Sequence, residues 1–259
     1  MITSVGNAGL PAPVGVNTKK VSIIVPAFNE ERLLPDTLQS IASAAGAFDQ
    51  AGWSSELIVC DNNSTDRTAQ IAAAAGARVV FEPVNQISRA RNAGAAIATG
   101  DWVLFVDADS HPSAPLFADV VRAIQSGDCI AGGSTVTVDS TLRSARFAAS
   151  AWNRLSRSTR WLAGSFIFCD TAVFRRIGGF SQRLYAAEEI DLSRRLKRLA
   201  RRDGRRIVVL HRHPLVTSAR KAHLYSWRDA LRFYARLTFT AGRALRTRDG
   251  AFIWYDGRR

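Results

Sequence analysis

The sequence has little cysteine and histidine, with three and four residues among 259. The cysteines, Cys60, Cys129 and Cys169, are far apart and in no metal-ligand spacing. This spacing argues against a disulfide framework or a zinc site and favours a reducing compartment, the cytoplasm. No apolar run approaches the roughly 20 residues that span a bilayer. Residues 1–18 lack the basic start and apolar core of a secretory signal, so we expect a flexible leader there.

Charge is abundant but unevenly distributed along the chain. Residues 1–140 carry 8 Lys and Arg against 14 Asp and Glu, whereas residues 141–259 carry 27 against 8, and the net charge is +13. A basic half of this size predicts an anionic partner: a nucleic acid, an acidic lipid surface or a phosphorylated substrate. A solvated arginine-rich surface is the alternative explanation of the same composition.

Short apolar runs alternate with segments of helical spacing. In the first half, strands are predicted at 21–25, 57–60, 79–81 and 102–106, and helices at 33–41, 68–75 and 87–98. Strands that alternate with helices predict βαβ units and a mostly parallel sheet. In the second half, helices are predicted at 114–126 and 190–199, and strands at 132–138, 164–168 and 207–210, while residues 142–161 form a longer segment rich in arginine and aromatic residues. We therefore expect an α/β fold with a mixed central sheet.

Polar side chains follow three of the predicted strands. They occur at residues 28–30, at residues 61–66, and at Asp107 and Asp109. Ligands of open α/β sheets bind beyond the carboxyl ends of the strands. Two carboxylates two residues apart suit Mg²⁺ or Mn²⁺ held together with substrate phosphates. The pattern predicts a metal-bridged diphosphate site, although an aspartate pair by itself also occurs in ordinary turns.

The loop after the second strand has two interpretations. Ser64 is a candidate N-cap of the next helix, with Asp66 near its positive end, which leaves Asp61 available to a ligand. Alternatively, Asp61 itself caps the turn, as aspartate commonly does. The sequence leaves both interpretations open.

Six motifs, in order, resemble the family 2 glycosyltransferases of the GT-A type. They are residues 21–30 (VSIIVPAFNE), 61–66 (DNNSTD), 91–94 (RNAG), 107–109 (DAD), 178–180 (GGF) and 188–192 (EEIDL). An ordered set is far more specific than one D-x-D motif. The resemblance implies one GT-A domain over residues 19–222, with a Rossmann-like nucleotide-binding half to about residue 110 and an acceptor half from about residue 111. It also implies metal-dependent, inverting transfer of a sugar from a UDP- or GDP-sugar to an acceptor hydroxyl.

The resemblance assigns donor-binding roles at the matching positions. The nucleoside pocket would be formed by Pro26, Phe28 and Glu30. Asp61 would hydrogen-bond the base, and Arg91 would face the donor phosphates.

The resemblance assigns metal binding to the D-A-D motif. Asp107, beside Ala108, would contact the ribose or the metal, and Asp109 would ligate Mn²⁺ or Mg²⁺ directly. A histidine just past a predicted strand, His213 or His211, would be a further ligand. Departure of a nucleoside diphosphate leaves charge on the β-phosphate, which a bound cation stabilises.

An acceptor hydroxyl loses its proton as it attacks, so a carboxylate or imidazole must lie within hydrogen-bond reach. The resemblance assigns this base to Glu189, where the family more often has the aspartate of a Glu-Asp-x-Asp motif. Because glutamate is one methylene longer, Asp191 remains the alternative base. An acidic cluster that stabilises the start of a helix is the structural alternative.

The end of the chain carries further signals. No Gln-x-x-Arg-Trp motif follows the acidic cluster, so we expect a single addition rather than polymer synthesis. Residues 217–221 are predicted to form a phosphate-facing loop or a basic surface turn. Residues 223–259 predict a basic amphipathic helix and tail. Its apolar side could lie on the inner face of a membrane and meet a lipid-linked acceptor, pack on the domain, or pair two copies into a homodimer.

Two other functions fit parts of the sequence. A nucleotidyltransferase acting on sugar phosphates also uses carboxylates and a metal, but it normally needs a glycine- and lysine-rich loop where residues 26–30 are PAFNE. A nucleic-acid-binding protein would use the basic half, but no zinc-finger, RNA-recognition or helix-turn-helix pattern is present. We therefore expect a nucleotide-sugar partner and no nucleic acid.

Overall fold

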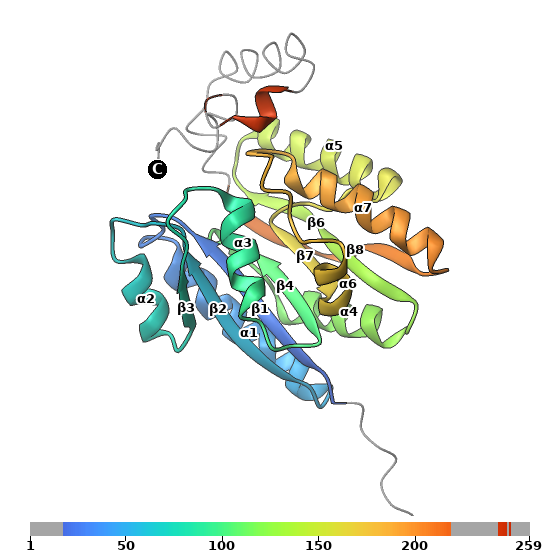
Figure 1. Ribbon diagram of the computed structural model, residues 1–259, viewed down its shortest axis with the longest axis horizontal. Coiled ribbons are helices and arrows are strands. Elements are labelled where there is room, and N and C mark those ends of the chain that lie inside the picture. The colour runs from blue at the N-terminus through green and yellow to red at the C-terminus, as the bar shows by residue number, and fades with distance from the viewer. Residues whose placement is uncertain (1–17, 219–242, 248, 250–259) are drawn as a thin grey trace, which may run out of the picture.

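The computed structural model describes residues 18–218, 243–247 and 249 (Figure 1). In these residues the chain forms an eight-stranded sheet with the order β3-β2-β1-β4-β7-β6-β8-β5. The strands are β1 (Lys20–Ala27), β2 (Ser54–Asp61), β3 (Arg78–Phe81), β4 (Trp102–Val106), β5 (Ser110–His111), β6 (Cys129–Asp139), β7 (Phe166–Asp170) and β8 (Arg206–Ser218).

The sheet is mixed, and its first half is parallel. β1 pairs in parallel with β2 and β4, and β2 pairs in parallel with β3. β7 runs antiparallel to both β4 and β6, while β6 and β8 are parallel. Every residue of β4 is buried, as expected of a strand covered on both faces. The predicted fold class, a mixed and mostly parallel α/β sheet, is confirmed.

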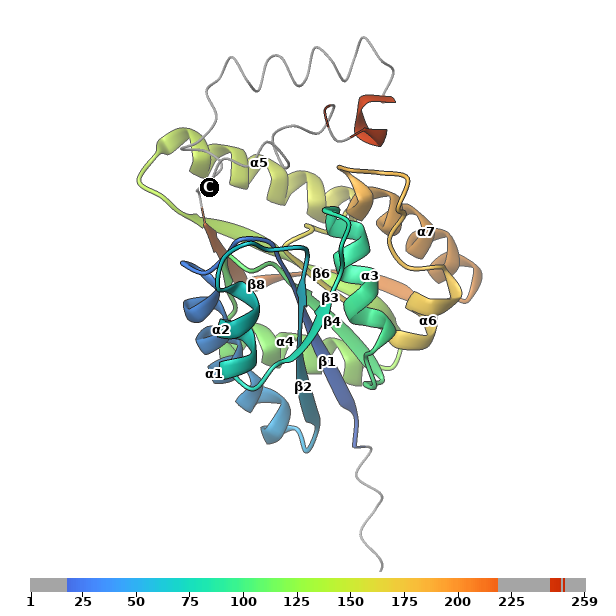
Figure 2. The same cartoon turned by 60° about the vertical axis from the view of Figure 1, so that its left-hand side comes forward.

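Helices cover both faces of the sheet (Figure 2). One apolar core joins the sheet to α1 (Leu34–Gln50), α2 (Thr68–Ala74) and α4 (Ala114–Gln125). The other core joins it to α3 (Ile87–Ala96), α6 (Thr171–Arg176) and α7 (Glu188–Arg202). α5 (Arg143–Thr159) packs on β6, where Asn153 donates to and accepts from the backbone of Val136.

The apolar spacing of α1 shows why these helices form where the sequence predicts them. Its buried apolar residues recur at intervals of three and four, from Leu34 through Leu38 and Ile41 to Phe48, which places them on one face. Phe48 stacks on Phe117 of α4 with ring centroids 5.0 Å apart. Full burial of one such side chain contributes about 1.5–3 kcal/mol. The two helices are therefore fixed to each other as well as to the sheet.

The structure corrects two predicted segments in the second half. β8 extends over Arg206–Ser218 rather than 207–210, because its second half is polar and partly exposed and so lacks an apolar run. Thr217 pairs with Ser110 of the short strand β5, which the sequence did not indicate. Residues 217 and 218 therefore belong to a strand and not to a phosphate-facing loop, while residues 219–221 lie outside the described part.

The terminal segments are mostly outside the described residues. The predicted leader over residues 1–18 is described only at residue 18, and of the predicted basic helix and tail the structure describes residues 243–247 and 249. Within that part, Arg243–Arg246 form a short 3-10 helix. In the portion of the chain that the structure describes, no helix is both long enough and apolar enough to cross a membrane.

Candidate active site

The loops after β1 and β2 are joined by hydrogen bonds into one unit. The backbone N–H of Asn29 donates to Oγ of Ser64 at 2.9 Å, and Thr65 N–H donates to Oδ1 of Asn29 at 2.8 Å. Glu30 N–H donates to Oγ1 of Thr68 at 2.8 Å. Asn29 and Asn63 have φ of 51° and 66°, a region that asparagine tolerates better than most residues. The two loops expected to bind the nucleoside are therefore side by side.

The structure decides between the two interpretations of the second loop. Oδ1 of Asp61 accepts a hydrogen bond from the backbone N–H of Ser64 at 3.0 Å, so Asp61 caps the turn. The predicted helix cap at Ser64 is wrong, because α2 begins at Thr68 and Arg67 occupies its N-cap position. Asp61 is 6% exposed, at the carboxyl end of β2.

The three residues expected in the nucleoside pocket differ in what they present to the surface. Pro26 is buried within β1, opposite Cys60 of β2. Glu30 is also buried, and its carbonyl accepts hydrogen bonds from Leu33 and Leu34. Phe28 is partly exposed. Of the three, Phe28 offers a ligand the most surface, while the other two shape the loop.

Arg91 of α3 lies at the centre of the site and joins two elements. Its Nη1 donates to Oε1 of Glu188 at 2.8 Å, and its Nη2 donates to Oδ1 of Asp107 at 2.9 Å and to the carbonyl of Gly164 at 2.8 Å. The guanidinium also lies 5.1 Å from the centroid of the Phe180 ring. Arg91 is 1% exposed. Burial opposes its charge, but the carboxylates of Asp107 and Glu188 raise the pKa of Arg91 above its ordinary value.

The structure gives Arg91 a bridging role, while its predicted facing toward the donor phosphates stays a prediction. The guanidinium is enclosed by two carboxylates and a carbonyl. Its fork geometry suits such a bridge, since one guanidinium can bind several acceptors at once. Arg91 therefore fixes the end of β4 to the start of α7.

The D-A-D motif follows β4 at the carboxyl edge of the sheet. Asp107 N–H donates to the carbonyl of Ser165 at 3.2 Å, and its side chain is 26% exposed. Ala108 is buried, and its carbonyl accepts from Thr37 Oγ1 at 2.8 Å. Asp109 is partly exposed, and its carbonyl accepts from Ser218 N–H at 3.0 Å. Backbone contacts on each residue thus fix the loop that carries the two carboxylates.

The two aspartates fit a hard divalent cation. Both carboxylates are partly exposed at the edge of the sheet, and Mg²⁺ commonly binds one or two protein carboxylates together with substrate phosphates. Over residues 18–218, 243–247 and 249, no group of three or more His, Cys, Asp or Glu side chains is arranged to hold a metal. A cation here would complete its coordination with oxygens from a substrate or from water.

The expected histidine ligand is paired with α4. Nδ1 of His213 is 2.9 Å from Oδ2 of Asp119 on α4. His213 lies in the irregular part of β8 between Leu210 and Leu215, four positions before Thr217, which pairs with β5 beside the D-A-D motif. His211 is exposed on the same strand. Both histidines lie within a strand that is longer than the sequence predicted, and metal ligation by His213 stays a prediction.

The acidic motif begins α7. Ala187, with φ of 62°, precedes the helix in a left-handed conformation. Glu188 is 4% exposed and bound to Arg91. Glu189 lies against Gly164, since a Cβ built on that glycine would be 3.7 Å from the carboxyl carbon of Glu189. The side chain of Glu189 therefore belongs to the same cluster as Arg91 and Asp107.

Glu189 and Asp191 are in different electrostatic environments. Burial, together with the nearby charge of Glu188, raises the pKa of Glu189 to about 8. Asp191 instead accepts a hydrogen bond from Nε of Arg195 at 2.8 Å along the helix and is 37% exposed. A carboxylate with a raised pKa binds a proton more strongly when it is ionised. The surroundings thus favour Glu189 over Asp191 as the base.

The sequence indicated neither Gly164 nor a separate role for Glu188. Glu188 was part of a motif, but its pairing with Arg91 joins residues 97 positions apart, which no local pattern shows. Gly164 contributes a backbone carbonyl, for which there is no residue-type signal.

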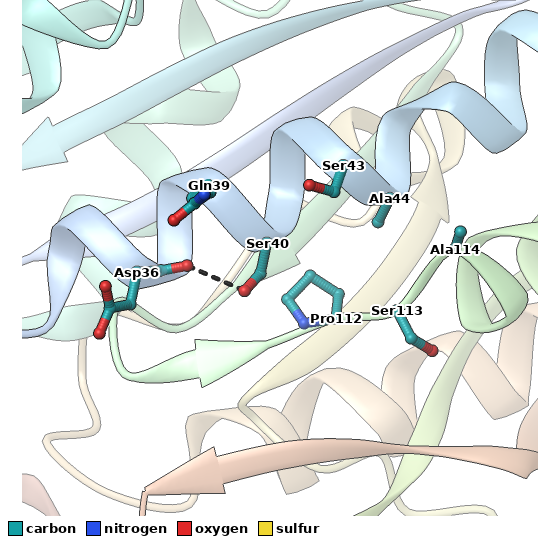
Figure 3. Close-up of a pocket in the computed structure, with 8 residues that line it drawn as sticks. All are labelled: Asp36, Gln39, Ser40, Ser43, Ala44, Pro112, Ser113 and Ala114. Carbon is teal, nitrogen blue, oxygen red and sulfur yellow. Dashed lines mark hydrogen bonds between the residues drawn. The ribbon is translucent and has the colours of Figure 1, made fainter.

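A hollow of about 390 Å³ lies between α1 and the start of α4 (Figure 3). It is lined by Asp36, Gln39, Ser40, Ser43, Ala44, Pro112, Ser113 and Ala114. None of the expected donor or metal residues contributes to it. This hollow is therefore separate from the carboxylate cluster.

The sheet, with an acidic cluster at the carboxyl ends of its strands, has the GT-A fold. S. aureus TarS 1-349 in complex with UDP-GlcNAc superimposes with a TM-score of 0.59 at 20% identity, over 90% of this chain and 69% of that chain. Glucosyl-3-phosphoglycerate synthase from Mycobacterium tuberculosis, in complex with Mn²⁺, UDP-Glc and phosphoglyceric acid, gives 0.56 at 22% identity, over 86% and 78%.

The chain belongs to glycosyl transferase family 2, whose family model matches residues 22–178, more than half of the sequence. An uncharacterized glycosyltransferase of M. tuberculosis is 37% identical over 113 residues, which are 43% of this chain and 47% of that protein. Glucosyl-3-phosphoglycerate synthase of Mycolicibacterium smegmatis is 35% identical over 107 residues, 38% of this chain and 34% of that protein. The matches therefore span less than half the length of these curated relatives.

Proposed function

We propose that the protein transfers one sugar from a UDP-sugar to an acceptor hydroxyl with inversion, using Mn²⁺ or Mg²⁺. The observation that carries this proposal is the joining of Asp107, Glu188 and Glu189 around Arg91 and Gly164. It supports the proposal because the residues proposed to bind the metal and to act as the base lie at the same end of the sheet. UDP is proposed ahead of GDP because the two solved structures named above contain uridine nucleotides.

On the donor side, Asp107 and Asp109 would hold the cation together with the diphosphate. When bound, this ion supplies positive charge where the leaving β-phosphate becomes more negative. Arg91 keeps Asp107 in place through a bond of 2.9 Å, so that the carboxylate is oriented before substrate arrives. Phe28 would contact the nucleoside at the end of β1, and Asp61 at the end of β2 would do so through the carboxylate oxygen other than Oδ1, which caps the turn.

On the acceptor side, Glu189 would accept the proton of the attacking hydroxyl. The bond from the acceptor oxygen to the sugar forms as the bond from the sugar to the β-phosphate breaks, and this single displacement inverts the anomeric carbon. Burial that raises the pKa of Glu189 to about 8 matches a base that must take a proton near neutral pH. Asp191 would remain in its ion pair with Arg195.

The surface of α5 supports a lipid-linked acceptor at a membrane. Phe147 is 76% exposed and Leu155 41% exposed, and α5 carries four arginines and no acidic residue. A basic helix with exposed apolar side chains suits an anionic lipid surface. Co-sedimentation with phosphatidylglycerol vesicles should weaken for Phe147→Ala but not for Phe81→Ala, a control on β3 that is 58% exposed. Equal binding of both variants would remove this part of the proposal, and a homodimer through the same face is the alternative.

The transferase proposal is tested by UDP release from UDP-glucose and UDP-GlcNAc, with Mn²⁺ or with EDTA. We expect release with Mn²⁺, little with EDTA, and a loss of 100-fold or more in Asp109→Asn and Glu189→Gln, a size typical of lost acid–base catalysis. Asp49→Asn, an exposed acidic residue at the end of α1, is the matched control. Activity unchanged in both site variants would refute the proposal.

Release of pyrophosphate would instead indicate a nucleotidyltransferase, and tight salt-dependent RNA or DNA binding would indicate a nucleic-acid function.

A further inference from the structure

One side of α3 binds the loop that leads into the acidic motif. This α6–α7 loop comprises residues 177–187, and α7 with Glu188 and Glu189 follows it directly. Gln86, Arg89 and Asn92 of the α3 segment occur at intervals of three residues, so they lie on one side of the helix. Each of them bonds to the loop. Contacts from α3 therefore fix the approach to the catalytic carboxylates.

Gln86 makes the most buried of these contacts. It is 3% exposed, and its Nε2 donates to the carbonyls of Gln182 and Leu184, each at 2.9 Å. Both hydrogens of one side-chain amide are used to hold two carbonyls of the loop backbone. Because Gln86 is buried and both hydrogen bonds are partly buried, their loss costs more than that of a fully exposed hydrogen bond.

Gln86 is itself fixed from the nucleoside end of the site. Its backbone N–H donates to Oδ1 of Asn62 at 3.0 Å, and Nδ2 of Asn62 donates to the carbonyls of Glu82 and Val84. Asn62 directly follows Asp61, the expected base-binding residue. A continuous set of hydrogen bonds thus runs from the end of β2, through Gln86, to the α6–α7 loop.

Asn92 explains the Gly-Gly-Phe motif at the other end of the loop. Its side chain donates to the carbonyl of Phe180 at 2.8 Å and accepts from the N–H of Phe180 at 2.9 Å. Gly179 has φ of 64°, and a Cβ there would lie 2.6 Å from Oδ1 of Asn92. Any larger residue at this position would displace Asn92, so glycine is needed for the contact.

We propose that Gln86 is a positioning residue for Glu189, coupling the loop that binds the nucleoside to the placement of the base. This inference rests on the proposed transferase function. Only residues 185–187 separate the bonded carbonyl of Leu184 from Glu188, which leaves little chain to absorb a shift. Displacement of a catalytic group by about 1 Å can reduce a rate about 100-fold. Gln86 therefore acts through the loop backbone and does not touch the substrate.

Gln125 provides the matched control for Gln86. It is the same residue type, exposed at the C-terminal end of α4, whereas Arg89 is unsuitable because its Nε also pairs with Oε1 of the buried Glu82 at 2.9 Å. Gln86→Met keeps the length of the side chain and removes both amide hydrogens. Gln86→Ala, which leaves space for water at the two carbonyls, is a second variant in case the first does not fold. Gln125→Met applies the same replacement at the control position.

The closing experiment combines hydrogen–deuterium exchange with steady-state kinetics on the full chain. We expect Gln86→Met or Gln86→Ala to raise exchange in residues 181–189 about tenfold, with residues 21–27 unchanged. UDP release from UDP-glucose with Mn²⁺ should show kcat lowered about tenfold or more, with KM and the Kd for UDP within twofold. Gln125→Met should change none of these values by more than twofold.

The possible results separate this inference from the proposed function. Unchanged exchange in residues 181–189 would overturn the role of Gln86, whatever the activity. Faster exchange with unchanged kcat would overturn the positioning role. A rise in the Kd for UDP as large as the loss in rate would also overturn it, because the variant would then have lost donor binding rather than placement of the base. If the wild-type protein were inactive with both UDP-sugars, the proposed function would be overturned, and with it the role of Gln86 in positioning a catalytic base. Hydrogen–deuterium exchange in residues 181–189 would still show whether Gln86 holds the loop.

Discussion

Replacing Arg91 by leucine removes the cation that binds both Glu188 and Asp107. The side chains of Arg91 and Glu188 are 2% and 6% exposed, so Glu188 would become a buried carboxylate without its partner. Breaking a buried pair in this way costs about 3–5 kcal/mol. Because the free energy of unfolding of a typical protein is only about 5–15 kcal/mol, the single variant should be severely destabilised.

The double variant Arg91→Leu/Glu188→Leu should recover much of that loss. It removes the unpaired charge together with its partner, and Asp107, which is 26% exposed, retains access to water. We expect the double variant to be about 1–3 kcal/mol more stable than Arg91→Leu. Urea unfolding at pH 7 measures each free energy by linear extrapolation, and the cycle of wild type, two single variants and double variant gives the interaction term.

Arg67→Leu provides the matched control. Its ion pair with Glu31 is exposed, with 79% of the arginine side chain accessible, and such pairs contribute about 0–1 kcal/mol. The effects of Arg91→Leu and Glu188→Leu on the free energy of unfolding could instead be additive to within about 0.5 kcal/mol. In that case the Arg91–Glu188 ion pair would not fix α7 to β4, and our interpretation of the site would be refuted.

Three further predictions concern protonation and metal binding. Because Glu189 must be ionised to act as a base and burial raises its pKa to about 8, kcat/KM for UDP release should rise from pH 6 and level off above about pH 8; a fall over this range would contradict the assignment. His213→Gln should leave the Kd for Mn²⁺ in the presence of UDP within twofold, whereas Asp109→Asn should raise it at least tenfold by calorimetry; an equal loss in both would indicate that His213 is a ligand. For Glu56, burial opposes ionisation, but hydrogen bonds from neighbouring side chains and backbone outweigh it and lower its pKa from 4.5 to about 2. The stabilisation that ionised Glu56 gives the folded state is therefore complete above pH 4.5 and is lost as the pH falls toward 2. The difference in urea stability between wild type and Glu56→Gln should therefore shrink by more than half between pH 7 and pH 3, and a constant difference would refute the shift.

Local patterns predicted the first half of the fold well. β4 was predicted at its observed bounds, because all five residues are apolar and buried, and the spacing of Leu34, Leu38 and Ile41 predicted the buried face of α1. β8 was predicted too short, since its exposed half contains His211 and His213 and has no apolar run. An exposed strand is specified by its pairing partners, which local sequence does not reveal.

The sequence predicted which residues lie near the candidate site, but it predicted few of the contacts between them. The convergence of residues 28–30, 61–66 and 107–109 followed from strands ending at the same edge of a parallel sheet. The burial of Arg91 between Asp107 and Glu188 did not follow, because it depends on how α3, β4 and α7 pack. The bond between Asp61 and Ser64 was one of two local alternatives, and only the backbone geometry decided between them.

Calorimetric titration of UDP into the protein, with Mn²⁺ and with EDTA, tests most directly whether the carboxylates after β4 form a metal-dependent nucleotide site. Asp109→Asn and the exposed control Asp49→Asn are titrated in the same way. We expect the wild type and the control to bind UDP at least tenfold more tightly with Mn²⁺ than with EDTA, and Asp109→Asn to lose this difference. Binding of equal strength in EDTA, or an Asp109→Asn variant that keeps the full effect of Mn²⁺, would contradict the proposed site.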